Sequence, residues 1–570
     1  MVRIPLLVLL GSALSGLNAL AQSTGTFVPT GNMTFARGSH TATLLKDGRV
    51  LLTGGVNASY GYAGSAGSAE LYDPSTGTFI ATGKMTTNRA GHTATLLQDG
   101  RVLVSGEYTG DGTSELYDPA TESFTQTGGN TDIHGSQVSN LLSNGKVLIS
   151  GPPSVEVYDP ASASDIRLGL MDHGTGAVVL KDDKLVIVGG ADVSLYDVAN
   201  DAFKLLASLP VPTIYDQTAT LLANGKVLIS GGHSNGFGQA TTDATALFDA
   251  SGRTIDSSGR LLVSRTYHSA TLLPGGRVLI YGGYHVGSDA QEVRLAAAEE
   301  YDPDTGSFTD AGHGAGLRGA HTATLLHDGT VLVAGGAFDT SAELYIPPLR
   351  AASAASLTGP LAPESLASLF GSRLALTTES ADPLSPPTTL GGIRLYVRDS
   401  IGDTWLAPLL YVSPSQINFE VPPGIALGNV KLEVVNAPVQ ASAVAAQVNN
   451  TAPGLFAFDD NTAAAYALRI EPNGKQTALS VRNTIVLDDR PMYLILYATG
   501  IRNRSSLANT RATIGGISVP VEYAGPEGSR IPGLDQVNVR LTPSLKGMGV
   551  ANMVLSVDGV PSNTVSVDIK

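Results

Sequence analysis

A segment that recurs seven times between residues 33 and 345 constrains the fold of this chain more than any other feature. In three copies, which begin at His40, His92 and His321, the histidine is followed by Thr-Ala-Thr-Leu-Leu. The other four copies are weaker and keep a pair of aliphatic residues, at Leu141-Leu142, Val179-Leu180, Leu221-Leu222 and Leu272-Leu273. A fixed period of roughly 40–50 residues is typical of propellers and solenoids, in which each repeat is one supersecondary unit.

Each copy is expected to form four short strands. The first apolar run is followed by a pair that accepts the positive φ angles of a hairpin turn: Asp47-Gly48, Asp99-Gly100, Asn144-Gly145, Asn224-Gly225 and Asp328-Gly329. The second strand is rich in Val and Leu and ends at Gly-Gly. The third follows the pattern of Ala69–Pro74, and the fourth centres on a Phe such as Phe79. Four strands per repeat predict the blade of a β-propeller.

The two ends of the repeat array are complementary. The segment Thr24–Phe27 reads as a fourth strand without the first three, whereas the last copy stops after Tyr345 without a fourth strand. We therefore expect the N-terminal strand to complete the last blade and close the ring, which removes the exposed strand edges. The alternative is an open solenoid, which needs atypical capping repeats that the sequence does not show.

The repeat resembles the kelch family of propellers. The residues that carry the resemblance are the Gly-Gly pairs Gly54-Gly55, Gly189-Gly190, Gly231-Gly232, Gly282-Gly283 and Gly335-Gly336, followed by Tyr72, Tyr196, Tyr301 and Tyr345. The Trp usual in that family is replaced by Phe79, Phe124, Phe203 and Phe308. The resemblance implies an all-β, seven-bladed kelch-type propeller, which we place at residues 22–347.

The N-terminus predicts export. Arg3 precedes a mostly apolar run, and Ala19-Leu20-Ala21 has the small-x-small form of a cleavage site. We expect a signal peptide at residues 1–21 and a secreted, extracytoplasmic protein without a transmembrane anchor after cleavage. The alternative is an uncleaved membrane anchor, which is disfavoured because small and polar residues interrupt the run: Gly11, Ser12, Ser15, Gly16 and Asn18.

Charge and cysteine content narrow the class of partner. The formal net charge is −15, which argues against nucleic acid as the main partner because phosphate binding needs a basic face. The chain has no Cys, so it forms no disulfide and has no thiol chemistry. We expect the fold to be held by packing alone.

The last third of the chain predicts a second all-β region with an internal duplication. Residues 346–360 are rich in Pro, Ala and Ser, and we expect a linker at 348–360. The segment Gln416–Pro422 is echoed by Gln536–Pro543, and Ser368–Gly371 is echoed by Leu496–Gly500. We expect two Ig-like β-sandwich modules, at 361–455 and 456–570.

The same region resembles a C-terminal domain found on many secreted acidobacterial proteins. The similarity runs from Pro383-Leu384 through Thr389–Gly392 and Ala407–Phe419 to Ala452–Phe456. It implies a generic role, such as presentation, anchoring or export, and no activity.

An Arg-x-x-His motif precedes the first strand in four copies: Arg37/His40, Arg89/His92, Arg265/His268 and Arg318/His321. In a closed ring these copies are consecutive, and the other three carry Gln137, Thr175 and Gln217 at the His position. Because first strands line the channel of a propeller, the motif predicts a basic arc at the channel mouth that binds an anion, an acidic sugar or a metal. The alternative is that Arg and His hold neighbouring blades together, which their repetition favours because a catalytic site is normally unique.

One copy resembles the copper-ligand segment of galactose oxidase, a secreted kelch-propeller enzyme. Tyr267 and His268 match its axial tyrosine and one histidine ligand. The other parts of that site are missing, since the crosslinked Cys is absent, the position of the cofactor tyrosine is Ser39, and the last His of the chain is His327. The resemblance therefore implies a shared scaffold without the copper-radical activity.

Other catalytic motifs are absent or incomplete. The chain has no Gly-x-Ser-x-Gly and no His-Glu-x-x-His. The segment Asp399–Trp405 approaches a sialidase-type Asp box with the Asp out of place, and Asp302-x-Asp304 has the spacing of half a calcium loop. A pair of carboxylates for glycoside hydrolysis leaves no local motif and stays open.

Two functions from different classes fit these patterns. The favoured one is a secreted, non-catalytic binding or scaffold protein whose propeller binds a glycan or protein, without a catalytic residue, metal or cofactor. Its candidate ligand-binding residues are Arg37, His40, Arg89, His92, Arg265, Tyr267, His268, Arg318 and His321. The alternative is a carbohydrate-active or metal-dependent enzyme on the propeller that uses Tyr267, His268 and His321, related to galactose oxidase but without its copper-radical site.

Overall fold

The protein is nearly all β, as the sequence predicts. The computed structural model describes residues 24–570 except 58–66, 107–111, 131–136, 152–153, 171–175, 181–183, 190–191, 198–199, 201, 209–214, 234–239, 250–253, 288–290, 337–339, 437–438 and 459–460. Within these residues there is no α-helix, and the helical segments are two short 3₁₀ turns, η2 (Leu507–Asn509) and η3 (Pro543–Leu545). The predicted signal peptide lies outside the described residues.

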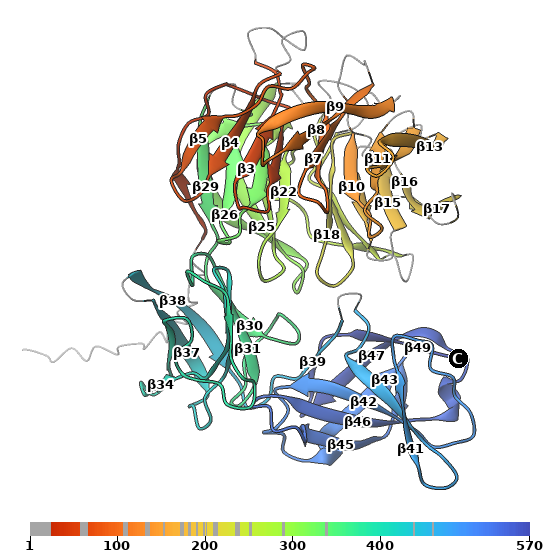
Figure 1. Cartoon of the computed structure of the whole chain (residues 1–570). Helices are drawn as coiled ribbons and strands as arrows, with labels where there is room; N and C mark the ends of the chain where they lie inside the picture. The colour runs from red at the N-terminus through yellow and green to blue at the C-terminus, as the bar shows by residue number, and fades with distance from the viewer. Residues whose placement is uncertain are drawn as a thin grey trace, which may run out of the picture.

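Antiparallel four-stranded sheets follow one another from residue 26 to residue 346, an arrangement consistent with a β-propeller (Figure 1). We number them sheets 1 to 7. Sheet 1 contains β2 (Thr41–Leu44), β3 (Val50–Thr53), β4 (Ala69–Asp73) and β5 (Thr78–Ala81). Sheet 2 contains β6 (Thr93–Leu96), β7 (Val102–Ser105), β8 (Thr113–Asp118) and β9 (Ser123–Asn130). Sheet 3 contains β10 (Val138–Leu141), β11 (Val147–Gly151), β12 (Ser154–Asp159) and β13 (Ser164–Leu170).

The remaining sheets repeat this order with two variations. Sheet 4 contains β14 (Gly176–Val179), β15 (Lys184–Gly189), β16 (Asp192–Asp197) and β17 (Ala202–Ser208). Sheet 5 contains β18 (Thr218–Leu221), β19 (Val227–Ser230), β20 (Thr245–Asp249) and β21 (Thr254–Ser257). Sheet 6 contains β22 (Ser269–Leu272), β23 (Val278–Tyr281), β25 (Glu292–Asp302) and β26 (Ser307–Arg318), with an extra strand, β24 (Tyr284–Val286), on β25. Sheet 7 contains β27 (Thr322–Leu325), β28 (Val331–Ala334), β29 (Ala342–Ile346) and the N-terminal strand β1 (Thr26–Pro29).

The predicted hairpin turns form between the first and second strands. Gly48 has a φ of 90°, and Asp47 Oδ1 accepts a hydrogen bond from the backbone N–H of Arg49 over 3.0 Å. The same bond forms in sheet 2, where Asp99 accepts from Arg101 over 3.0 Å. The second strand that follows is buried at every residue in β3, β7, β19, β23 and β28.

The innermost strands contact one another in a closed series. The strand β2 contacts β6 and β27, and the contacts continue through β10, β14, β18 and β22. The strand β1 pairs with β29, with Thr26 opposite Ile346 and Phe27 opposite Tyr345, as the complementary ends predict. The ring of Phe27 lies 4.8 Å from that of Tyr281 and 4.9 Å from that of Tyr345, so β1 is held by packing as well as by its ladder.

Beyond the ring, two pairs of sheets share the order of their central strands. The first pair consists of β30 (Arg350–Ser353), β31 (Leu366–Phe370), β36 (Gln416–Glu420), β35 (Leu409–Val412) and β32 (Glu379–Ser380), facing β34 (Thr404–Leu406), β33 (Ile393–Arg398), β37 (Gly428–Asn436) and β38 (Val439–Val448). The second consists of β41 (Gln476–Ser480), β40 (Ala465–Ile470), β42 (Met492–Thr499), β46 (Asp535–Leu541), β45 (Val521–Pro526) and β39 (Gly454–Leu455), facing β44 (Ile517–Val519), β43 (Thr510–Ile514), β47 (Gly549–Val557), β48 (Val560–Pro561) and β49 (Val565–Ile569).

The internal duplication seen in the sequence is visible in this topology. The Gln-x-Asn strands β36 and β46 pair with the echoed strands β31 and β42. In both, the Gln donates to the Asn two residues later, over 2.7 Å from Gln416 to Asn418 and 2.6 Å from Gln536 to Asn538. Each pair of sheets encloses its own apolar core.

The C-terminal sheets contact the turn end of the ring. Part of the expected linker is strand β30, which begins only four residues after β29 ends. Arg350 forms an ion pair of 2.9 Å with Asp304, and Arg373 forms one of 3.0 Å with Asp328. Both aspartates lie in strand-connecting turns of sheets 6 and 7, so the loops that carry the Arg-x-x-His motif lie at the other end of these sheets.

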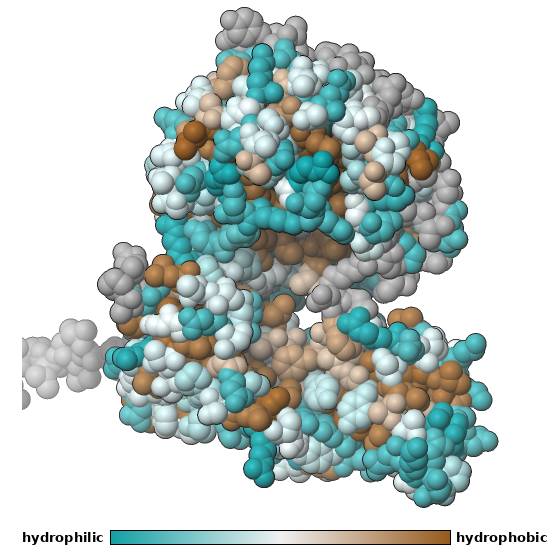
Figure 2. Space-filling model, viewed as in Figure 1, coloured by the Kyte–Doolittle hydropathy of each residue, from teal (hydrophilic) through white to brown (hydrophobic). Residues whose placement is uncertain are grey.

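The surface agrees with the low charge of the sequence. Charged residues make up 15% of the chain, and the space-filling view shows hydrophilic, weakly polar and apolar residues interspersed on the face in view (Figure 2). Apolar residues also gather in the recess between the ring and the C-terminal sheets (Figure 2).

Candidate active site

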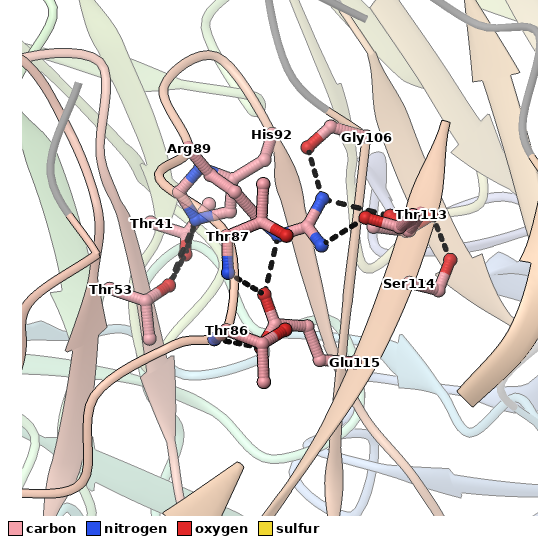
Figure 3. Close-up of polar contacts among 11 residues, drawn as sticks. Thr41, Thr53, Thr86, Thr87, Arg89, His92, Gly106, Thr113, Ser114 and Glu115 are labelled. Carbon is pink, nitrogen blue, oxygen red and sulfur yellow. Dashed lines mark hydrogen bonds and ion pairs between the residues drawn. The ribbon is translucent and has the colours of Figure 1, made fainter. Parts of the chain in front are cut away.

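The arginines of the Arg-x-x-His motif are buried inside their own sheets. Figure 3 shows the arrangement in sheet 2, where Arg89 Nε donates to Glu115 Oε1 over 2.8 Å. Its Nη1 donates to the carbonyls of Gly106 and Thr113 over 3.1 and 2.8 Å. Thr86 donates its backbone N–H and its hydroxyl to the second oxygen of Glu115. The pair therefore ties the loop before the first strand to the second and third strands.

The same Arg–Glu pair recurs in four consecutive sheets. Its members, all at most 4% exposed, are Arg265–Glu299, Arg318–Glu343, Arg37–Glu70 and Arg89–Glu115. Each arginine also donates to the carbonyl 17 residues later, of Gly282, Gly335, Gly54 and Gly106. Sheets 4 and 5 have Ser194 and Ala246 at the Glu position, and no Arg at the Arg position. Sheet 3 keeps a buried Glu156 but has His134 at the Arg position. Each motif arginine therefore comes with a glutamate, as expected when a lone buried charge is costly, whereas the glutamate also occurs without the arginine.

The histidines of the motif tie each sheet to its neighbour. His92 Nε2 lies 3.0 Å from the Thr41 hydroxyl and 2.9 Å from that of Thr53, both in sheet 1 (Figure 3). Equivalent bonds join His40 to Thr322, His268 to Thr218 and His321 to Ser269. Each ring packs against the first Gly of a Gly-Gly pair in the preceding sheet. A Cβ on Gly54 would lie 2.4 Å from the Arg89 carbonyl oxygen and 2.7 Å from His92 Cε1, so the backbone and the imidazole of the next sheet together leave no room for a side chain.

These histidines are neutral. Burial, reinforced by nearby arginines, lowers the pKa of His92 and His321 to about 3, and it also places the pKa of His40 and His268 well below the usual value. Eight of the nine predicted ligand-binding residues are thus at most 9% exposed and bonded within the protein. The ninth, Tyr267, is partly exposed. Ligand binding by this set stays a prediction.

The residue before each histidine has a left-handed backbone conformation. Its φ is 52° at Ser39, 64° at Gly91, 51° at Tyr267 and 54° at Ala320. Backbone hydrogen bonds link these positions from sheet to sheet, from Ala320 N to Tyr267 O over 3.1 Å and from Ser39 N to Ala320 O over 2.9 Å. These residues, rather than the arginines and histidines, are the partly exposed ones at this end of the ring. Left-handed conformations are strained for bulky residues such as Tyr267.

Sheet 5 has an acidic residue at this position, which the sequence reasoning missed. Asp216, with a φ of 56°, accepts a hydrogen bond from His233 Nε2 over 3.1 Å. The Asp216 and His233 side chains are 13% and 10% exposed. The ring of Tyr215 stacks on that of His233 at 5.6 Å. No local motif marks this group, because Asp216 and His233 are 17 residues apart; the usable signal is that both depart from the repeat.

Sheet 6 places two tyrosines at the equivalent positions. Tyr267 and Tyr284 are also 17 residues apart, and their rings pack edge to face with centroids 5.9 Å apart. A backbone bridge between Thr266 and Tyr284 corresponds to the bridge between Tyr215 and His233 in sheet 5. The side chain of Arg294 lies over the ring of Tyr284, with its Cζ 5.8 Å from the ring centroid.

Two other motifs have structural explanations. Asp399 accepts hydrogen bonds from Trp405 Nε1 and from the backbone of Ile401 and Asp403, which closes a tight turn. Asp304 pairs with Arg350, so this carboxylate joins the ring to the C-terminal sheets.

Comparison with known proteins supports a galactose-oxidase-like all-β fold. A solved structure described as a novel fungal alcohol oxidase with catalytic diversity among the AA5 family, in complex with copper, matches 75% of this chain and 100% of its own, with a TM-score of 0.51 and 17% identity. A structure described as that of YjhT matches 49% of this chain and 98% of its own, with a TM-score of 0.38 and 15% identity. No protein-family model matches the sequence, and no curated protein matches it.

This comparison corrects the expected function. A non-catalytic binding or scaffold role is contradicted, because the structure similar to three quarters of the chain is that of an enzyme. At 17% sequence identity, the similarity shows a common fold and does not show a common activity.

No helix among the described residues is long and apolar enough to cross a membrane.

The residues present do not fit a copper site like the one named in that structure's description. His268 is 7% exposed, and its Nε2 is bonded to Thr218 and Ser230. The part of the chain that the structure describes contains no group of three or more His, Asp or Glu side chains placed to hold a metal, and the sequence has no Cys. Tyr267 therefore lacks the ligand set that copper requires.

Proposed function

We propose that this protein is an exported enzyme that acts on a hydroxyl-bearing, carbohydrate-like substrate by proton transfer, at the loop end of sheets 5 and 6. Asp216 is the acid or base, His233 positions it, and Tyr267 and Tyr284 form a stacking surface. The fold likeness to an alcohol oxidase supports a substrate with hydroxyl groups. The pairing of His233 with Asp216 supports proton transfer as the chemistry.

The scaffold in this proposal is a closed seven-bladed propeller followed by two Ig-like sandwiches. The closed series of inner-strand contacts and the β1–β29 ladder support the propeller at 22–347. The duplicated strand orders and the two separate cores support modules at 361–455 and 456–570. The apolar run at residues 1–21 supports export.

The observation that carries the proposal is a departure from the repeat at two coupled positions. In the sequence these are the residue before the motif His and the residue 17 later: Ser39/Val56, Gly91/Tyr108, Ser136/Pro153, Gly174/Ala191, Asp216/His233, Tyr267/Tyr284 and Ala320/Ala337. Only sheets 5 and 6 have polar aromatic or ionisable side chains at both. Residues common to all copies serve the fold, so residues peculiar to two neighbouring copies are candidates for chemistry.

The geometry assigns a role to each group. His233 donates Nε2–H to Asp216, and its Nδ1 is buried, so the imidazole orients the carboxylate rather than meeting a substrate. Asp216 is partly accessible and is therefore the group that exchanges a proton. Sugars present C–H faces that stack on aromatic rings, a surface that Tyr267 and Tyr284 provide.

The test is turnover of a broad panel of plant, algal and bacterial polysaccharides, followed by proton NMR so that any change of bond is detected. General acid–base catalysis contributes roughly 10²–10⁴-fold, so Asp216→Asn is expected to lower kcat by at least about 100-fold. The control is Ser39→Asn, which places the same residue at the equivalent left-handed position of sheet 1. Equal turnover by Asp216→Asn and wild type, or no turnover of any polysaccharide, would contradict the proposal.

A further inference from the structure

The two pairs of C-terminal sheets are duplicates, so their edge strands can be compared residue by residue. In the first pair β38 runs along β37, with Gly428 opposite Val448. In the second pair β49 runs along β47, with Gly549 opposite Ile569. Both β37 and β47 begin at this glycine, which makes β38 the counterpart of β49. In the described part of the chain, each of these two strands is the last of its sheet on that side.

The free edge of β49 is covered by two segments of the chain. The backbone N–H of Ser566 donates to Asn461 O over 2.8 Å, and Ala463 N donates to Ser566 O over 2.9 Å. Further along the strand, Ile485 N donates to Asp568 O over 2.8 Å. Residues 461–463 therefore add to the sheet like a short strand, parallel to β49.

The free edge of β38 is covered at only one of these two places. Leu361 takes the position of Ile485: its N–H donates to Gln447 O over 2.8 Å, and its carbonyl accepts from Asn449 N over 2.9 Å. Among the described residues of the first pair, nothing corresponds to the segment 461–463. The reason is that β30 runs along β31 without interruption, whereas the second pair has this segment between β39 and β40, which both run along β42.

The backbone groups left open are those of Ala443 and Ala445. Backbone groups of alternate residues point to the same side of a strand, and Gln447, whose carbonyl meets Leu361, shows which side this is. No hydrogen bond from another described segment reaches either alanine on this side. Both alanines are exposed, whereas Ser566, the counterpart of Ala445, is partly buried. An exposed edge with open donors and acceptors is a template for pairing with another extended chain.

Two cations lie next to this edge. Arg398 is directly opposite Lys431, and both side chains are exposed. Like charges directly opposite one another destabilise a sheet, and Glu433, 3.2 Å from Lys431, offsets one of the two charges. The corresponding positions of the second pair hold the uncharged residues Gly515 and Asn552. The basic pair therefore occurs in the sheet pair with the open edge.

A trough of about 410 Å³ joins the two cations to the edge. Its lining includes Arg398, Lys431, Ala443 and Ala445. Lys431 is opposite Ala445, whose methyl group leaves the space above β38 to longer side chains. Neighbouring strands lie about 4.8 Å apart, so a strand added to β38 lies about 10 Å from β37, and an acidic side chain on it can meet Lys431 over the alanine.

We propose that the open edge of β38 binds an extended, acidic segment of another protein. The segment adds to the sheet at Ala443 and Ala445 as residues 461–463 do in the second pair, and its carboxylates lie beside Lys431 and Arg398. The open backbone groups of the edge select a peptide, and the basic pair selects its charge. This inference does not rest on the proposed enzyme activity, because β38 lies outside the ring (Figure 1).

The probe is a synthetic peptide with the sequence of residues 456–465, which contains the covering segment of the second pair and two aspartates. Calorimetric titration of the full chain is expected to show binding. Methylation of the peptide nitrogen at Ala463, which donates to Ser566 in the second pair, should weaken binding about tenfold or more. The matched control is methylation at Thr462, whose carbonyl faces the other way, toward Phe458 N, and it should change affinity less than about twofold.

Variants of the protein locate the peptide. Ala445→Pro removes one outward N–H from the edge, where proline is tolerated, and should weaken binding about tenfold or more. Lys431→Gln should weaken it about two- to fivefold, as expected for an exposed charge pair. The control is Lys475→Gln, which makes the same charge change on an exposed turn of the second pair and should have no measurable effect.

The inference is overturned if the unmodified peptide does not bind, or if the two methylated peptides bind equally. Unchanged binding by an Ala445→Pro variant that melts like the wild type would place the peptide elsewhere, with the same result. If that variant does not fold, the two methylated peptides still decide on the wild-type chain. A dimer in sedimentation that does not bind the peptide and that Ala445→Pro dissociates would make a second copy the occupant, and this also overturns the inference.

Discussion

Sheets 6, 7, 1 and 2 carry the buried Arg–Glu pair and the histidine tie, whereas sheets 3, 4 and 5 carry neither in full. Sheet 5 has Ala246 where sheet 2 has Glu115, and Gln217 where sheet 2 has His92. Gln217 Nε2 still donates to Val188 O of the preceding sheet, over 3.2 Å. The strand order is nevertheless the same in both arcs. The β-sheet framework therefore does not depend on the polar network.

The difference shows where the fold leaves room for chemistry. In sheets 7, 1 and 2 the left-handed position before the histidine is Ala320, Ser39 and Gly91, which are small and suit tight packing. At the edge between the two arcs, in sheets 5 and 6, the same position holds Asp216 and Tyr267. The Arg–Glu pairs and histidine hydrogen bonds fix the backbone of sheets 6, 7, 1 and 2. The side chains that depart from the repeat lie where sheet 6 adjoins sheet 5.

The largest effect is expected from breaking one buried ion pair. Arg89→Ile leaves Glu115, which is 0% exposed, without its cation, so it should lower the free energy of unfolding by about 3–5 kcal/mol. The double variant Arg89→Ile/Glu115→Ala reproduces the Ile214/Ala246 combination of sheet 5 and should recover a substantial part of this loss. Guanidinium denaturation measures both. A single variant no less stable than the double one would show that the pair is not a unit.

A smaller effect is expected from adding one methyl group between sheets. Gly282→Ala combines a φ of 63° with a Cβ 2.7 Å from both the Arg318 carbonyl oxygen and His321 Cε1, and we expect a loss of about 2–3 kcal/mol. The control is Gly225→Ala in sheet 5, which has a φ of 80° but nothing within 4 Å, and should cost only about 1 kcal/mol. Equal losses in the two variants, measured by thermal unfolding, would mean that the close contact of Gly282 with sheet 7 does not matter.

The pH dependence of stability separates the two arcs. An unfolded His has a pKa of 6.5, whereas burial lowers that of His321 to about 3, so the unfolded chain binds one more proton between these values. Stability is therefore lost as the pH falls from about 6.5 toward 3, by about 1.4 kcal/mol per pH unit for one histidine. His321→Gln, which copies sheet 5, should reduce this slope by that amount. Denaturant midpoints between pH 4 and 7 test this prediction. An unchanged slope would indicate that the His321 imidazole is protonated in the folded state.

The smallest effect is expected at an exposed ion pair. Lys226 of sheet 5 pairs with Asp256 over 2.8 Å, with side chains 31% and 49% exposed. Because solvent screens such pairs, Lys226→Met should change the free energy of unfolding by at most about 1 kcal/mol. A loss comparable to that of Arg89→Ile would remove the distinction between buried and exposed pairs.

The local elements could be predicted from sequence, because turns and strands depend on neighbouring residues. Asp47-Gly48 specifies its hairpin turn. The pairing of Thr24–Phe27 with the last copy could be predicted because that copy is the one without a fourth strand of its own. The partner of Arg89 was missed, since Glu115 is 26 residues away on another strand. A comparison of the copies within the chain would have suggested it, because all four copies with the Arg have a Glu on the third strand, whereas sheets 4 and 5 have neither residue.

The candidate site was harder to predict, because it depends on differences between copies. The Arg-x-x-His motif, which includes Arg265 and His268, predicts a site from residues that are common to four copies, and these residues are buried. The informative residues were the ones that break the pattern, Asp216 and His233 in sheet 5. Their proximity depends on the backbone bridge between Tyr215 and His233, which no pattern in the sequence specifies.

The pairing of β1 with β29 sets the order in which the ring assembles. Thr26 in β1 pairs with Ile346 in β29, so the partner strand of β1 is the last part of the ring to be synthesised. Joining segments so far apart carries a large loop-closure entropy, which makes this step late. A chain that ends before Ala342 would leave Phe27 without Tyr345, and its apolar edge would stay open to aggregation or proteolysis. The pairing of β1 with β29 thus distinguishes a completely synthesised ring from a truncated one.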